Sequence, residues 1–188
     1  MWKKKKLTYD ICVPPISKPH DAFDSDETYD YFQWYINIIP ERIDYLIKVC
    51  AKDLKIEENK IDFSAESLLL IWKWFLNIAK TEKNENGHLI MDLQTEYICR
   101  DIGMYFGEMF NTNFDSIYWS YYEAPRTDVF VNKPLLKGFK DNCVSPPFDA
   151  VFEPIHMVRV QACKILKNRQ NVDDLLKIYN IWVEKIPK

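Results

Sequence analysis

The sequence predicts an α+β protein that is mainly helical, with a small antiparallel sheet, folded as a single domain over residues 1–188. Three observations predict this class. Apolar residues recur at helical spacing along most of the chain. Only 4 of the 188 residues are glycine, which disfavours a sandwich or barrel with many tight turns. One stretch past the middle is rich in aromatic and β-branched residues, which are typical of strands.

The first part of the chain is predicted to hold a short strand and three helices. The strand covers residues 7–13 and ends at a pair of prolines. A helix is predicted over residues 26–38, with its first aspartate as N-cap. The proline at position 40 either begins a second helix, over residues 40–53, or kinks a continuous one. Ser64 is a favourable N-cap for the next helix, over residues 65–80, which is apolar nearly all round and is therefore expected at the centre of the core.

The middle of the chain is predicted to hold a polar loop and a long helix. The loop covers residues 81–88 and turns at its glycine. The helix covers residues 90–111 and carries Gly103 and Gly107 on the same face as Arg100. Because glycine lowers helix stability by up to about 1 kcal/mol relative to alanine, we expect these two positions to let another element approach closely. Glu96 and Arg100 have the i, i+4 spacing of a surface ion pair.

The last third is predicted to combine a hairpin with two helices. Residues 117–123 and 128–132 form the hairpin, with a four-residue loop between them. Residues 133–153 contain three prolines and a glycine, which predicts a long loop. A helix follows over residues 154–168, and Asn171 is expected to cap the final one.

Charge and motifs exclude several classes of function. The net charge is −3 although residues 3–6 are all lysine, so the rest of the chain is acidic and unsuited to a phosphate backbone. We predict a solvated basic tail at residues 1–6, no nucleic-acid partner and no membrane association. The three histidines lack ligand spacing, and the five cysteines lack CxxC spacing, so we predict no metal, no cofactor and reduced thiols in the cytoplasm. No catalytic motif is present, so no catalytic residue is assigned, although an enzyme is not excluded.

Two groups of residues are candidates for a surface that binds a protein partner. The first is an acidic segment at residues 21–30, which would attract a basic protein surface. Its carboxylates are Asp21, Asp24, Asp26, Glu27 and Asp30. The second is the aromatic run of the hairpin, where strand alternation places Tyr118 and Tyr122 on one face, with Arg126 in the loop nearby. Tyrosine and arginine are enriched at interface hot spots. The alternative for the acidic segment is a solvated helix N-terminus, where carboxylates are also favourable.

A third candidate is a pocket near Glu108 and Trp119. Glu108 follows Gly107 on a largely apolar helix, and a buried carboxylate can serve as a general acid or base. The alternative is a structural carboxylate that pairs with a neighbour.

Two stretches resemble a known group of proteins. Residues 61–68 (IDFSAESL) follow a pattern of an extended piece, a serine and then a helix that begins Glu-Ser-Leu, with Ala65 where the pattern has proline. Residues 102–108 (IGMYFGE) resemble an IGxYxGE helix that is followed by a tryptophan, here Trp119. The combination is similar to small bacterial proteins of domain-of-unknown-function type, some of which look like immunity proteins of toxin systems. The resemblance spans about residues 60–120 and carries no activity with it.

These observations together favour a non-enzymatic protein that binds a basic protein partner, with toxin immunity as one form of that function. An enzyme or small-ligand binder with a pocket at Glu108 is the first alternative. A structural protein that associates with itself through exposed aromatic residues is the second, and the sequence leaves the oligomeric state open.

Overall fold

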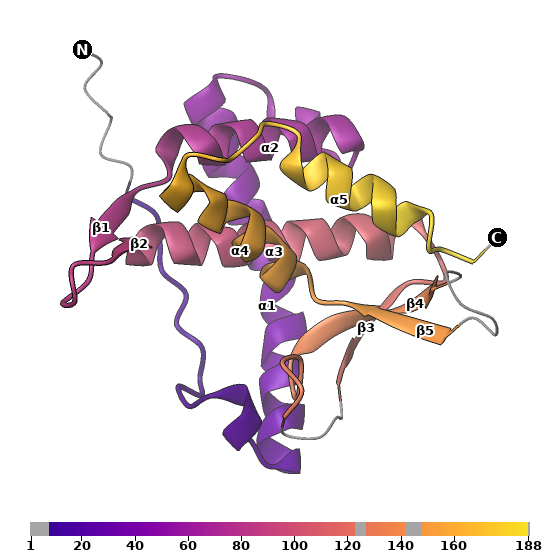
Figure 1. The fold of residues 1–188 in the computed structure, drawn as a ribbon. Coiled ribbons are helices and arrows are strands. Elements are labelled where there is room, and N and C mark those ends of the chain that lie inside the picture. Colours follow the sequence, from indigo (N-terminus) through magenta and orange to yellow (C-terminus); the bar gives the residue numbers. More distant parts are fainter. Residues whose placement is uncertain (1–7, 123–126, 142–147, 188) are drawn as a thin grey trace.

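The fold is an assembly of helices with a small sheet at one side, and the predicted α+β class is confirmed. The computed structural model describes residues 8–122, 127–141 and 148–187. The basic tail at residues 1–6 and Arg126 lie outside this part of the chain. Figure 1 shows the long first helix crossing the molecule, with the sheet beside its N-terminal half. None of the helices in the described part is both long enough and apolar enough to cross a membrane.

The elements follow one another as helices interrupted by two short antiparallel sheets. The α-helices are α1 (Ser25–Leu54), α2 (Ala65–Ile78), α3 (Leu93–Asn113), α4 (Pro154–Ala162) and α5 (Asp174–Val183). The strands are β1 (Thr81–Lys83), β2 (Leu89–Met91), β3 (Tyr118–Tyr121), β4 (Pro134–Asp141) and β5 (Phe148–Phe152). Short 3-10 helices are η1 (His20–Ala22), η2 (Glu58–Lys60) and η3 (Cys163–Lys167).

The first helix is longer than either predicted piece. α1 runs from Ser25 to Leu54 without interruption and contains Pro40, so the continuous alternative holds. Its N-cap is Asp24, not Asp26 as predicted, because Asp24 and Glu27 form a reciprocal capping box with two bonds of 2.9 Å. The predicted strand at residues 7–13 is wrong for the described residues 8–13, which form no strand.

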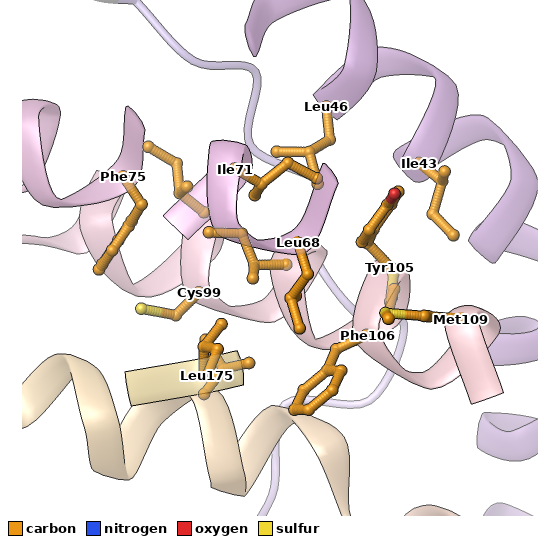
Figure 2. Packing of buried hydrophobic residues seen from close by; sticks show 14 of the residues in the cluster. Ile43, Leu46, Leu68, Ile71, Phe75, Cys99, Tyr105, Phe106, Met109 and Leu175 are labelled. Atoms are coloured by element: carbon orange, nitrogen blue, oxygen red, sulfur yellow. The ribbon is translucent and has the colours of Figure 1, made fainter. Parts of the chain in front are cut away.

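The core forms around α2, as predicted. Leu68, Ile71, Trp72 and Phe75 are fully buried, and Ser64 caps the helix by accepting a bond from the backbone N–H at position 67. Figure 2 shows α2 side chains in contact range of residues from three other helices. The labelled side chains of these other helices are Ile43 and Leu46 of α1, Cys99, Tyr105, Phe106 and Met109 of α3, and Leu175 of α5.

The predicted hairpin of residues 117–123 with residues 128–132 is wrong. β3 pairs with β4 instead, in a three-stranded sheet of order β3-β4-β5. Residues near 128–132 form turns because the Asp128 side chain accepts a bond from the N–H of Phe130, and Asn132 has a left-handed φ of 57°. The predicted loop over residues 133–153 is therefore largely strand in its described parts, residues 133–141 and 148–153, while residues 142–147 lie outside the described residues. Its proline at 134 is tolerated as the first residue of β4.

Three smaller predictions are also corrected. The loop over residues 81–88 forms a hairpin of β1 and β2, although its glycine does turn the chain, with a φ of 77°. The helix predicted over residues 154–168 ends at Ala162 and continues as η3. The last helix has Asp173 at its N-cap position, while Asn171 donates its backbone N–H to Asp174 at 2.7 Å.

The close approach predicted at Gly103 and Gly107 is confirmed. A Cβ at Gly103 would lie 2.7 Å from the Cα of Ile155, so the backbone of α4 runs directly against α3. A Cβ at Gly107 would overlap the ring of Trp119. Because neither glycine has a side chain, the first turn of α4 and strand β3 can pack closely against the same face of α3.

Candidate functional site

A hollow of about 300 Å³ lies where this face of α3 meets α1, α4 and the start of β4. We call it the Arg100 pocket. It combines basic, acidic and aromatic side chains that are distant in the sequence. Its walls are His20, Tyr31, Tyr35, Glu96, Arg100, Lys133, Pro134, Glu153, Ile155, His156 and Arg159.

Arg100 is the most unusual group in the pocket. The residue is only 8% exposed, and its Nε and Nη2 atoms are buried with no hydrogen-bond partner among the described residues. Its nearest carboxylate oxygen is Asp101 Oδ1, at 3.6 Å from Nε, which is too far for a hydrogen bond. The guanidinium also lies 4.8 Å from the ring centre of Tyr97. Nε and Nη2 share one edge of the guanidinium, and such an edge matches the two oxygens of a carboxylate or phosphate.

Glu153 is the buried acid of the pocket. It is 4% exposed and caps α4, where its two oxygens accept the backbone N–H groups of Ile155 at 3.2 Å and His156 at 2.6 Å. Burial raises the pKa of Glu153 to about 7, while these two bonds and the charge of Lys133 act in the opposite direction. The group is therefore close to half protonated at neutral pH.

The remaining charges leave the pocket positive. Arg159 is paired with Glu96 (Nε to Oε2, 3.0 Å), so the predicted pairing of Glu96 with Arg100 is wrong. Among the other charged residues that line the pocket, Lys133 and Arg100 are opposed by Glu153, which is partly neutral at pH 7, while Asp101 lies 3.6 Å from Arg100 Nε outside the lining. A basic hollow in a protein of net charge −3 marks this site as one suited to an anion.

Two histidines flank the pocket in their neutral form. Burial lowers the pKa of both His20 and His156, and the charge of Lys133 lowers both further. The Nδ1 atom of His20 lies 3.2 Å from the backbone oxygen of Asn132, which holds the ring against the turn before β4. Neutral imidazoles can donate or accept a hydrogen bond, so they add polar contacts without adding charge.

Two tyrosines from α1 complete the wall. Tyr35 is fully buried, and its hydroxyl has no hydrogen-bond partner in the described part of the chain. Burial raises the pKa of Tyr35 well above its ordinary value and that of Tyr31 to about 12. Both hydroxyls therefore stay protonated and are available as donors.

A second buried arginine, Arg42, has its guanidinium hydrogen-bonded to other groups of the protein. Arg42 of α1 is 1% exposed and binds Asp101 Oδ2 through Nε at 3.1 Å and Nη2 at 2.7 Å. It also binds the carboxylate and the backbone oxygen of Asp10, at 3.0 and 2.8 Å. The hydroxyl of Tyr9 donates to the same Asp101 oxygen at 2.9 Å. This network anchors residues 9–10 to α1 and α3.

The predicted acidic segment lies at the start of α1, outside the Arg100 pocket. Asp21, Asp24, Asp26 and Asp30 are exposed, and Glu27 is half-buried. Asp24 and Glu27 are occupied by the capping box, and Glu27 also pairs with Lys18 at 2.5 Å. These contacts support the solvated-terminus alternative for those two carboxylates and leave the other three facing solvent.

The predicted aromatic surface is partly exposed. Tyr118 is 54% exposed, whereas Tyr122 is half-buried. The ring of Tyr121 lies 5.3 Å from that of Phe32 on α1, so β3 packs beside the acidic start of that helix. The third predicted member of this surface, Arg126, falls outside the described residues.

The structure brings Glu108 and Trp119 together, as the predicted pocket required. The indole Nε1 of Trp119 donates to Glu108 at 2.5 Å, and Asn111 is a second donor at 3.4 Å. Neither residue lines the Arg100 pocket. The half-buried Glu108 carboxylate thus holds β3 against α3, and a catalytic use of it stays a prediction.

Sequence reasoning did not single out the groups that form the Arg100 pocket. One signal was present: Arg100 and Asp101 are adjacent charges within a largely apolar helix. A second was Glu153 directly before Pro154, a typical helix start. Neither signal shows that the two helices meet.

Comparisons with protein-family models, curated proteins and solved structures find no match to this chain. Within the described residues, no group of three or more His, Cys, Asp or Glu side chains is arranged to hold a metal ion. The chemistry of the Arg100 pocket therefore carries the functional interpretation.

Proposed function

We propose that this protein binds a small anionic molecule in the Arg100 pocket through a carboxylate or phosphate group. One observation carries the proposal: a nine-tenths-buried arginine lines a hollow, and its Nε and Nη2 atoms have no hydrogen-bond partner among the described residues. Burying donors without acceptors costs about 1–3 kcal/mol for each group, and more when the group is charged. A bidentate oxyanion would remove that cost.

The size and lining of the pocket define the class of ligand. A volume of about 300 Å³ is at the lower end of the range for small-molecule sites. The Tyr35 hydroxyl adds a neutral donor beside Arg100, while Pro134 and Ile155 add apolar surface. These features fit a compact molecule with one oxyanion group and a short apolar or hydroxylated body.

The experiment is calorimetric titration of the full chain with sulfate, acetate and inorganic phosphate at pH 6 and constant ionic strength. We expect at least one of these anions to bind, with Arg100→Gln weakening binding at least tenfold. Arg100→Lys should also weaken it, because an ammonium keeps the charge but lacks the two-donor edge.

The control is Arg169→Gln, which removes the same charge from an exposed position outside the pocket. This variant should bind like the wild type. Equal weakening by both variants would mean that general charge, not the pocket, attracts the anion. The proposal fails if none of the three anions binds the wild-type protein.

A second candidate function is binding of a basic protein partner, which follows from the position of β3 beside the acidic start of α1. Asp21, Asp26 and Asp30 are exposed, and Tyr118 presents more than half of its side chain to solvent. Toxin immunity is one form that such binding would take. The ring contact between Phe32 and Tyr121 supports this candidate by joining the two surfaces.

The test replaces Asp21, Asp26 and Asp30 by Asn and keeps the capping residue Asp24 intact. Immobilised wild type and variant are exposed to lysate at low and moderate salt. A basic protein that the wild type retains at low salt and the variant loses would support the candidate, because exposed charge attraction is screened by salt. Equal retention by both proteins would show that the acidic segment does not contribute to partner binding.

A further inference from the structure

Glu153 and Arg100 face the same small hollow, and this shared position links a titratable acid to the proposed anion site. Glu153 is 4% exposed, and no ion pair neutralises it among the described residues. Among the described residues, the hydrogen-bond donors to its carboxylate are the backbone N–H groups of Ile155 and His156. An anion held by Arg100 and an ionised Glu153 would share one hollow of about 300 Å³, where two negative charges repel each other.

We infer that Glu153 takes up one proton when an anion enters the Arg100 pocket, so that the pocket holds its ligand on the acidic side of neutrality and releases it on the alkaline side. The inference rests on the proposed anion binding. The proton comes from solvent and stays on a Glu153 oxygen, so no bond of the ligand is formed or broken.

The other charged groups around Glu153 favour this exchange. Arg100 and Lys133 attract the anion and remain charged throughout the relevant pH range. Arg159 and Glu96 neutralise each other in an ion pair. Protonation of Glu153 therefore removes the one negative charge of the pocket that is not already paired among the described residues.

The titratable rings of the pocket do not replace Glu153 in this role above pH 7. Burial lowers the pKa of both His20 and His156, so in the free protein these rings gain protons in more acidic solution than Glu153 does. The hydroxyls of Tyr31 and Tyr35 are protonated with or without ligand, because burial raises both pKa values. The window from pH 7 to 8 thus isolates Glu153.

The sign of the effect follows from linkage. The pKa of Glu153 in the free protein is about 7, and a bound anion raises it. The contribution of Glu153 to affinity is then constant well below pH 7 and falls up to about tenfold for each pH unit between the free and bound values. Proton uptake by Glu153 per bound anion is then at most about 0.5 at pH 7 and about 0.9 at pH 8.

The experiment titrates the full chain with sulfate, which carries no proton of its own to exchange between pH 6 and 8. Titrations at pH 7.5 are run in Tris and in triethanolamine, two buffers that contain no acidic group and differ in ionisation enthalpy. The difference between the two observed enthalpies gives the number of protons taken up. We expect uptake in the wild type, none in Glu153→Gln, and wild-type uptake in the matched control His156→Gln.

The outcomes separate the inference from the proposed function. Sulfate binding without proton uptake in the wild type would overturn the inference and leave the anion site standing. Uptake that persists in Glu153→Gln would also overturn it, and its loss in His156→Gln would assign the proton to that histidine. No sulfate binding at pH 6 or 7.5 would overturn both. Proton counting on the wild type needs no variant, so it stays informative if Glu153→Gln does not fold.

Discussion

Arg42 and Arg100 are both buried arginines, yet their surroundings differ in a way that separates structural from functional use. Arg42 binds two carboxylates and a backbone oxygen. Arg100 has one edge of its guanidinium buried without a hydrogen-bond partner in the described part of the chain. A buried cation is tolerated when it is paired, and an unpaired one destabilises the fold. The comparison therefore indicates that Arg42 stabilises the protein, and the unpartnered edge of Arg100 is the observation behind the proposed anion site.

Asp101 lies between the two arginines and forms hydrogen bonds with only one of them, Arg42. Its Oδ2 accepts bonds from Arg42 and from Tyr9, whereas its Oδ1 is buried without a partner among the described residues, 3.6 Å from Arg100 Nε. Burial raises the pKa of Asp101, although the bonds from Arg42 act against this shift. The negative charge of Asp101 thus interacts mainly with Arg42, so that Arg100 can interact with another anion.

The largest expected effect is on the stability of the protein when Arg42 is lost. Arg42→Met leaves the Asp101 carboxylate buried without its main partner, so we expect a loss of about 3–5 kcal/mol in the free energy of unfolding, measured with urea. The double variant Arg42→Met with Asp101→Asn should recover part of the loss. A cost below about 1 kcal/mol for Arg42→Met would remove the contrast between the two arginines.

The second effect is a pH dependence of stability caused by Glu153. Its pKa is about 7 in the folded protein and near 4.5 in the unfolded chain, so its contribution is fully present below pH 4.5 and is lost as the pH rises through 7. Relative to Glu153→Gln, the wild type should lose up to about 3 kcal/mol between pH 4.5 and 8. Comparing urea midpoints of the two proteins at pH 5 and 8 cancels the contribution of the histidines. An equal difference at both pH values would show that Glu153 ionises normally.

The third effect concerns the contact that shapes the pocket. Gly103→Ala places a methyl group against the backbone of Ile155, between Glu153 and His156, and pushes the first turn of α4 away from α3. We expect a loss of about 1–3 kcal/mol and weaker binding of sulfate. Thr112→Ala, at an exposed position of the same helix, should change neither property. Unchanged stability of the Gly103 variant would mean that α4 shifts at no cost.

The smallest expected effect on stability comes from Arg100 itself. Arg100→Met removes a buried cation that lacks a full partner, so we expect a change within about 1 kcal/mol of the wild type, in either direction, together with loss of sulfate binding. Urea unfolding and calorimetry on the same preparation test both parts. A loss of stability as large as that of Arg42→Met would show that Arg100 also stabilises the fold, and the contrast between the two arginines would then be wrong.

The sequence predicted well wherever local chemistry decides the structure. Helical periodicity and the Ser64 cap located α2, and the spacing of Gly103 and Gly107 predicted close contacts that the structure confirms. The sequence did not predict the pairing of β3 correctly. The true partner, β4, lies in a proline-containing stretch that resembled a loop, and the nearer candidate segment forms a turn at Asp128. Strand pairing is a long-range choice that local propensity does not determine.

The Arg100 pocket was decided by tertiary structure alone. The sequence by itself determined that the protein is mainly helical, that its net charge is negative and that α3 carries a charged pair inside an apolar pattern. It did not determine which of the two buried arginines finds carboxylates and which does not. That outcome depends on the packing of α1, α3 and α4, which buries Glu153 and Arg100 in one hollow and places Asp101 against Arg42. The physical reason is that burial and charge pairing depend on distances between residues far apart in the chain.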